Sequence, residues 1–132
     1  MITVLFACIQ NAGRSQMAAA LFNAAADPSK ARAISAGTAP APHVHPEVVA
    51  AMREVGVDLS AGIPQKLTED LARQAQWLIT MGCGDRCPIV PGAVRHDWAI
   101  ADPHGQPAER VRAIREDIAR RVSDLVAGNN WR

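Results

Sequence analysis

The 132-residue sequence lacks the features that mark several large classes of protein. No apolar stretch approaches the roughly 20 residues that a membrane-spanning helix needs. Basic and acidic residues nearly balance, giving a formal net charge of +1, and the 12 arginines are scattered along the chain. A nucleic-acid-binding protein would instead carry a basic stripe or patch. We therefore predict neither a membrane nor a nucleic acid as a partner.

Cysteine is also scarce, with three residues in the chain. The opening apolar run at 2–7 is too short for a signal peptide and has no basic leader, so a cytoplasmic location is expected. Cysteines are kept mainly reduced in that compartment. An odd number of cysteines also fits poorly with a purely structural disulfide framework. We therefore consider all three as candidates for chemistry.

What the chain does contain is an alternation of strand-like and helix-like segments. Strands are expected at 2–7, 31–36, 77–81 and 94–98, and helices at 15–26, 46–55, 67–74 and 107–128. The last helix is the clearest, because five apolar residues form one stripe along it: Val111, Ile114, Ile118, Val122 and Leu125. No linker or repeat interrupts residues 1–132, so one domain is expected. The alternation predicts an α/β fold with a parallel sheet covered on both faces, and ligands at the carboxyl ends of its strands.

The segment that follows the first strand has the pattern C-x5-R-S and leads into a helix. Its residues are Cys8, Ile9, Gln10, Asn11, Ala12, Gly13, Arg14 and Ser15. Backbone N–H groups that curl into a helix N-terminus form an anion site, and glycine lets the backbone turn tightly there. The Arg14 guanidinium can hold two oxygens of a tetrahedral anion at once. We therefore predict that residues 9–15 bind an oxyanion.

Cys8 is the candidate nucleophile of this loop. A cysteine below a helix N-terminus tends to be a thiolate at neutral pH, and the thiolate is the reactive form. Ser15 can donate a hydrogen bond to the sulfur, and Asn11 can brace the loop. The alternative is that Cys8 is a small buried hydrophobe and Arg14 a surface charge. The position of the motif between an apolar strand and a helix favours the catalytic interpretation.

The sequence resembles the low-molecular-weight phosphotyrosine phosphatase family, and within it the arsenate reductases. The resemblance rests on residues 8–17, on the turn Ser35-Ala36-Gly37-Thr38 and on the pair Asp102-Pro103, which occur in the family's order. It implies a three-layer fold in which helices flank a four-stranded parallel sheet. It also implies a Cys–Arg loop that binds the oxyanion and an aspartate that protonates the leaving oxygen, here Asp102. Asp97 is the competing carboxylate, for which a structural role beside Trp98 is expected.

Cys83 and Cys87 distinguish a reductase from a phosphatase. Arsenate reduction needs two electrons, which a thiol pair supplies by forming a disulfide, whereas ester hydrolysis needs one cysteine and water. Glycines on both sides of Cys83 would allow its backbone to move, and thiol exchange can proceed through mixed disulfides. The alternatives are two unreactive loop cysteines or half of a metal site. Four histidines without zinc-type spacing give no support to a metal site, so none is predicted: His43, His45, His96 and His104.

Two further features favour the reductase branch. Gln16 follows Ser15, where the phosphatases usually carry proline, and the chain has no tyrosine, a residue that usually lines the phosphatase entrance. The sequence also departs from some arsenate reductases at two places. Gly13 stands where several thioredoxin-coupled relatives have an extra cysteine, and the run at 18–20 lacks the acidic residue that helps some relatives bind potassium.

The resulting hypothesis is an arsenate reductase with no bound cofactor, in which electrons pass through Cys8, Cys83 and Cys87 to an external thiol reductant. Thioredoxin is the expected reductant, and a low-molecular-weight thiol is the alternative. Phosphate is expected to compete with arsenate, and weak phosphatase activity is expected as a by-product. Two other functions stay open at this point. One is a phosphomonoesterase or protein tyrosine phosphatase, and the other is a non-catalytic module that binds an oxyanion or arsenite.

Overall fold

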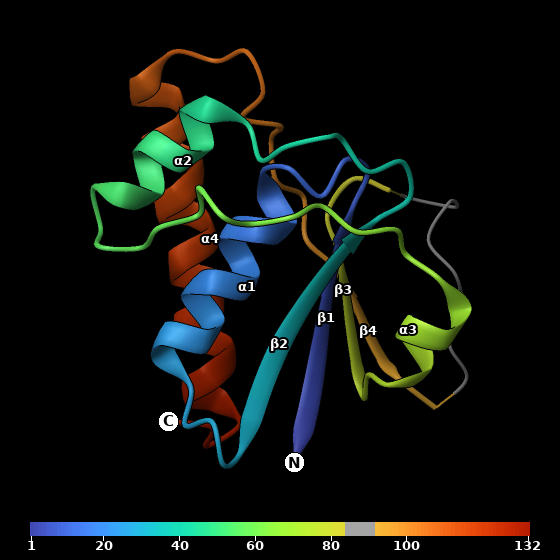
Figure 1. Cartoon of the computed structure of the whole chain (residues 1–132). Helices are drawn as coiled ribbons and strands as arrows, with labels where there is room; N and C mark the ends of the chain where they lie inside the picture. Colours follow the sequence, from blue (N-terminus) through green and yellow to red (C-terminus); the bar gives the residue numbers. More distant parts are fainter. Residues whose placement is uncertain (84–91) are drawn as a thin grey trace.

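Four parallel strands form one sheet in the computed structural model, which describes residues 1–83 and 92–132 (Figure 1). The strand order is β2-β1-β3-β4. Along the described chain the elements are β1 (Ile2–Cys8), α1 (Arg14–Ala25), β2 (Ala31–Gly37), α2 (Pro46–Arg53), α3 (Glu69–Arg73), β3 (Trp77–Thr80), β4 (Val94–Asp97) and α4 (Ala108–Gly128). The predicted α/β fold with a four-stranded parallel sheet and flanking helices is confirmed.

The central strand β1 is buried on both faces, as its unbroken apolar sequence predicts. Because side chains alternate along a strand, Phe6 and Cys8 pack on the side of α1, α2 and α4, whereas Leu5 and Ala7 pack on the side of α3. Figure 1 shows these two helical layers on opposite faces of the sheet. Cys8 therefore faces the layer formed by α1, α2 and α4, and not the layer formed by α3.

The helices follow the sequence signals closely, with one shift on α4. Four members of its predicted stripe are buried, but Val126 rather than Leu125 completes the buried face. Since α4 has 3.6 residues per turn, position 126 lies directly below 122 and faces the core. At α3 the predicted cap is present, because Thr68 Oγ1 accepts a hydrogen bond from Leu71 N at 3.1 Å.

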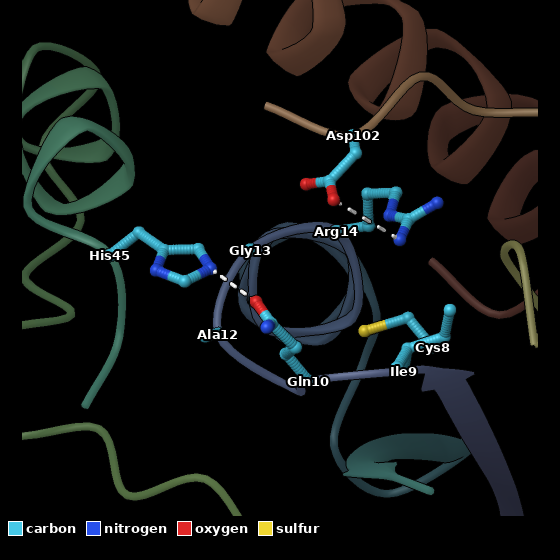
Figure 2. Close-up of a pocket in the computed structure, with 8 residues that line it drawn as sticks. All are labelled: Cys8, Ile9, Gln10, Ala12, Gly13, Arg14, His45 and Asp102. Carbon is cyan, nitrogen blue, oxygen red and sulfur yellow. Dashed lines mark hydrogen bonds and ion pairs between the residues drawn. The ribbon is translucent and has the colours of Figure 1, made fainter. Parts of the chain in front are cut away.

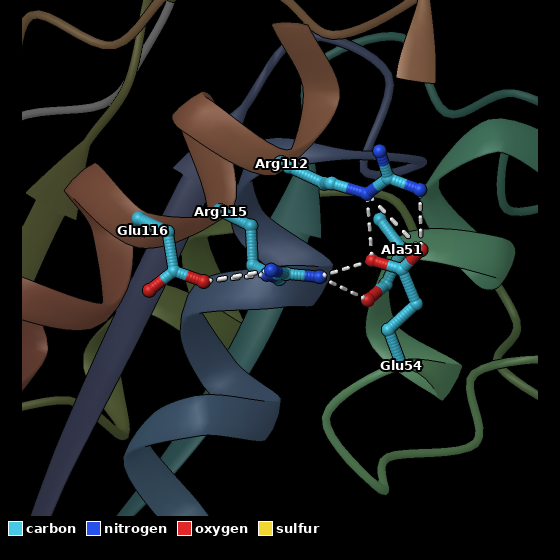
Figure 3. Close-up of polar contacts among 5 residues, drawn as sticks. All are labelled: Ala51, Glu54, Arg112, Arg115 and Glu116. Carbon is cyan, nitrogen blue, oxygen red and sulfur yellow. Dashed lines mark hydrogen bonds and ion pairs between the residues drawn. The ribbon is translucent and has the colours of Figure 1, made fainter. Parts of the chain in front are cut away.

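Helices α2 and α4 are joined by a group of ion pairs centred on Glu54 (Figure 3). Arg112 Nη2 and Arg115 Nη1 each lie 2.8 Å from a Glu54 carboxylate oxygen. Arg115 Nη1 also donates to the Ala51 carbonyl oxygen at 2.7 Å, and its guanidinium contacts Glu116. These hydrogen bonds lower the pKa of Glu54 to about 2, with Arg112 contributing most. They fix α2, which borders the site, against the long helix.

The topology decides where the site lies. The chain leaves β1 toward β2 on one side, and β3 pairs with β1 on the other, so the carboxyl end of β1 is a switch point where ligands bind in such sheets. The C-x5-R-S segment begins there. None of the described helices combines the length and apolar character needed to cross a membrane.

Candidate active site

The loop between β1 and α1 is held from outside through its carbonyl oxygens. Four residues that follow β2 donate backbone hydrogen bonds to the loop: Thr38 N to Cys8 O at 3.2 Å, Ala39 N to Ile9 O at 2.8 Å, Ala41 N to Gln10 O at 2.9 Å and His45 N to Ala12 O at 2.9 Å. These bonds turn the loop's carbonyl oxygens outward. The sequence indicates only the turn at 35–38 and not this contact, because the two segments are distant in the chain.

The backbone N–H groups of residues 9–13 differ from the loop's carbonyl oxygens, because none of them donates a hydrogen bond to any residue in the described ranges. A buried N–H group without a partner is costly, so a row of them marks a place for an acceptor. Asn11 is buried in the left-handed conformation, with φ of 49°, which helps the loop curl into the helix N-terminus. The loop is therefore shaped to receive an anion.

Cys8 lies beneath this loop in a directed chain of hydrogen bonds. Asn11 Nδ2 donates to Ser15 Oγ at 2.7 Å, and Ser15 Oγ lies 2.9 Å from Cys8 Sγ. The Ser15 hydroxyl accepts from Asn11 and can donate its own proton to the sulfur. Asn11 is held in turn by Gln65 N, which donates to its Oδ1 at 3.0 Å. These hydrogen bonds hold the sulfur of Cys8, a free cysteine, at the base of the loop.

Arg14 begins α1 and is almost fully buried, with its side chain 10% exposed. Its Nη1 donates to the Ile100 carbonyl oxygen at 3.3 Å, and its Nη2 lies 3.9 Å from Asp102 Oδ2 (Figure 2). Among the described residues Asp102 is the one carboxylate paired with this buried guanidinium, and at that distance the guanidinium keeps donors available for another anion. The structure thus places the predicted clamp and the predicted acid side by side.

Asp102 is carried by the loop between β4 and α4, here called the acid loop (residues 98–107). Its carboxylate is half exposed, and Oδ1 accepts a hydrogen bond from His104 N at 3.0 Å. The next residue, Pro103, packs against Gly13, where a Cβ would lie 3.0 Å from the proline Cγ. The small residue at position 13 is therefore explained by this contact as well as by the turn. Asp97 instead accepts from Thr80 Oγ1 and lies near Arg95, which lowers its pKa.

These groups line a cavity of about 130 Å³ (Figure 2). Its walls are Cys8, Ile9, Gln10, Ala12, Gly13, Arg14, His45 and Asp102. His45 was not anticipated as a site residue. Its Nε2 lies 2.9 Å from Gln10 Oε1, and burial, with His104 as the next cause, lowers its pKa. His45 could not be assigned to the cavity from the sequence, because its position there depends on how β2 and α2 pack beside the loop.

Cys83, the first of the two predicted redox cysteines, lies at the end of the described segment that follows β3. Cys83 is buried among the residues on the α3 side of the sheet, and its Sγ lies 4.0 Å from the Ala7 carbonyl oxygen. Cys8 belongs to the cluster on the other side. Cys83 is disulfide-bonded in this structure. Cys87 lies outside the described residues, so its predicted role stays a prediction.

The chain belongs to the low molecular weight phosphotyrosine protein phosphatase family, whose pattern it matches over residues 3–130. This assignment confirms the resemblance identified from the loop, the Gly37 turn and Asp102. The family is named for a phosphatase whereas several relatives are named reductases, so the family match by itself defines the fold and not the reaction.

The more similar relatives are reductases. A Halobacterium salinarum protein provisionally named an arsenate reductase is 41% identical over 124 residues, covering 91% of this chain and 87% of that protein. The thioredoxin-dependent arsenate reductase of Corynebacterium glutamicum matches with a TM-score of 0.83 and 40% identity. The match covers 97% of this chain but 61% of that longer one. An arsenate reductase in the phosphate-binding state has a TM-score of 0.81 and 32% identity, with 97% and 98% coverage.

Proposed function

We propose that this chain is an arsenate reductase that uses Cys8 as its nucleophile. The observation that carries the proposal is the loop at 9–13, whose N–H groups have no hydrogen-bond partner among the described residues, above a cysteine whose Sγ lies 2.9 Å from Ser15 Oγ. The similarity to reductases selects arsenate from among tetrahedral anions. A phosphate-binding relative supports phosphate as a competing ligand.

In the first half-reaction the loop and Arg14 hold arsenate while the Cys8 thiolate attacks arsenic. A sulfur–arsenic bond forms and an arsenic–oxygen bond breaks. The departing oxygen needs a proton, which Asp102 supplies as water leaves. The distance of 3.9 Å between Arg14 Nη2 and Asp102 Oδ2 supports this role, because a protonated Asp102 carboxyl there would lie beside the guanidinium that we propose holds the substrate.

The second half-reaction transfers two electrons to arsenic. In this proposal the Cys83 thiolate attacks Cys8 Sγ, so that a disulfide forms while the sulfur–arsenic electron pair stays with arsenic, which leaves as arsenite. Cys87 then attacks Cys83, which returns Cys8 as a thiolate. A thioredoxin-type dithiol reduces the resulting Cys83–Cys87 disulfide and becomes oxidised itself. The compartment we propose is the cytoplasm, where such reductants keep thiols reduced.

The relay requires movement, because the two sulfurs lie on different sides of the sheet in this structure, in which Cys83 is disulfide-bonded and Cys8 is free. Cys83 packs with Leu5 and Ala7, while Cys8 packs with the α1 layer. Both lie at the carboxyl end of the sheet, so Cys83 can reach Cys8 around the end of β1 if Cys83 leaves its buried position beside the exposed Gly82. Gly82 has φ of +88°, a conformation that concentrates the bend at one residue.

The second candidate is a phosphomonoesterase, which the same loop, Arg14 and Asp102 favour. The decisive assay follows arsenate reduction with thioredoxin, thioredoxin reductase and NADPH, beside a chromogenic phosphate ester and beside a low-molecular-weight thiol. Arsenate-dependent NADPH oxidation with thioredoxin supports the proposal. Ester hydrolysis without arsenate reduction by either thiol system supports the phosphatase. Oxyanion binding with neither reaction would leave a binding module.

A further inference from the structure

Three residues at the rim of the oxyanion cavity come together from separate segments. His45 precedes α2, Glu47 lies in its first turn, and His104 follows Asp102 in the acid loop. Each offers one ligand atom, and these atoms lie within 4.8 Å of one another. The chemistry already assigned to the cavity uses none of the three.

One pair within the group has the spacing of two ligands on a tetrahedral ion. Zinc binds nitrogen and oxygen at about 2.0–2.2 Å, so two ligands on a tetrahedral ion lie roughly 3.4 Å apart. His104 Nδ1 and Glu47 Oε1 are separated by 3.4 Å. The imidazoles of His45 and His104 stack with centroids 3.9 Å apart and planes 21° apart, so the half-exposed His104 ring must turn for both nitrogens to face one ion.

His45 has the environment of a prepared ligand. It is buried, with 9% of the residue exposed, and Gln10 Oε1 accepts from its Nε2 at 2.9 Å. Because the amide oxygen can only accept, this bond keeps a proton on Nε2 and a lone pair on Nδ1. No described residue hydrogen bonds to Nδ1, which lies on the ring edge away from Gln10 in Figure 2. Ligating imidazoles commonly donate their other N–H to such an oxygen.

The remaining two ligands are open to an arriving ion. The His104 side chain is 56% exposed and that of Glu47 27%. Two imidazoles and one carboxylate are a donor set that suits zinc, and a fourth position would be left for water. We propose that His45, Glu47 and His104 bind a divalent cation of the zinc type. Bound there, the cation ties the acid loop to the first turn of α2.

The test uses Zn²⁺ itself and does not depend on any activity of the chain. The three cysteines are first replaced in a Cys8→Ser/Cys83→Ser/Cys87→Ser variant, because thiolates would compete for the ion. Zn²⁺ is then titrated against a chromophoric chelator, with folding checked by circular dichroism. One ion per chain is expected. The affinity should fall at least about tenfold in His104→Ala and Glu47→Gln, and should be unchanged in His43→Ala, the matched control for an exposed histidine.

Cobalt provides a second measurement on the chain with its cysteines intact. Co²⁺ bound to nitrogen and oxygen ligands should show visible ligand-field bands without thiolate charge transfer, and His104→Ala should remove them. The proposal is wrong if His104→Ala keeps the parental Zn²⁺ affinity, or if no ion binds. It is also wrong if the only Co²⁺ signal is a thiolate band. In those cases the three residues form only a hydrogen-bonded contact between α2 and the acid loop.

Discussion

Gly82 lies directly against the guanidinium of Arg14, with no room for a side chain between them. A Cβ built on Gly82 would overlap Arg14 Nη1 and lie 3.2 Å from Cζ. The same residue adopts the left-handed conformation next to Cys83. The glycine thus has two roles, because it gives the backbone its bend and leaves space for the oxyanion clamp. Motion of residues 82–83 toward Cys8 would also change the packing of Arg14.

The first prediction follows from this contact. Gly82→Ala should displace the Arg14 guanidinium, and a misplacement of about 1 Å can cost roughly 10²-fold in turnover. The loss should be measured as kcat/KM for arsenate and as affinity for phosphate. Gly56→Ala is the matched control, because Gly56 has a similar φ of +81° but nothing within 4 Å. It should cost about 1–2 kcal/mol of stability and leave kinetics near the parent. Equal kinetic losses in the two variants would contradict the steric argument.

The second prediction concerns the guanidinium itself. Arg14→Lys keeps a positive charge but removes the two-pronged donor geometry and the bond to Ile100 O. Phosphate affinity and arsenate turnover should fall by at least about tenfold while the far-ultraviolet circular dichroism is unchanged. Arg53→Lys, at an exposed pair with Asp58, serves as the control. Parental kinetics in Arg14→Lys would remove Arg14 from the clamp.

The third prediction distinguishes two carboxylates. Asp102→Asn should slow the first half-reaction by about 10²–10⁴-fold, because the amide cannot deliver the proton. Rapid-quench measurement of a single turnover isolates that step from reduction by thioredoxin. Asp97→Asn should have little effect on it, since Asp97 is held by Thr80 outside the cavity. If the Asp97 variant is the slow one, the acid has been assigned to the wrong loop.

The fourth prediction concerns stability against pH. Hydrogen bonds from Arg112 and Arg115 lower the pKa of Glu54 from 4.5 to about 2. A carboxylate with a lowered pKa stabilises the fold above pH 4.5, and that contribution is lost as the pH falls toward 2. Glu54→Gln should therefore lower the urea midpoint most at neutral pH, with the difference from the parent shrinking below pH 4.5. Glu69→Gln, whose carboxylate pairs with Arg73 within α3, should follow the parental pH profile.

Much of the fold and half of the site could be predicted from the sequence, because their signals are local. Cys8, Arg14 and Ser15 lie within one strand-loop-helix unit, so their spacing alone indicates an anion loop. Strand β4 has a weak sequence signal because it is an exposed edge strand without an apolar pattern. The buried strands and the helices are enough to show the alternation of strand and helix that predicts an α/β fold.

Contacts between distant segments could not be predicted in the same way. His45 joins the cavity because residues 38–45 bond to the loop's carbonyl oxygens, and nothing in its local sequence indicates this. The contact of Gly82 with Arg14 likewise depends on β3 pairing next to β1. Cys83 packs against Leu5 and Ala7, whose side chains point to the opposite face of β1 from Cys8. The spacing of the cysteines in the sequence does not reveal that they lie on opposite faces of the sheet.

The last prediction tests the relay, whose first thiol exchange must bring together two sulfurs from opposite layers of the sheet. Cys83→Ser should abolish arsenate turnover with thioredoxin, and Cys87→Ser should trap a Cys8–Cys83 disulfide that peptide mass mapping detects. Both variants should keep whatever ester hydrolysis the parent has, because water clears a phosphorylated Cys8 without a second thiol. That retained activity is the control for folding. Should Cys83→Ser reduce arsenate at the parental rate with thioredoxin, Cys83 would not be the attacking thiol, and the external reductant would have to attack Cys8 directly.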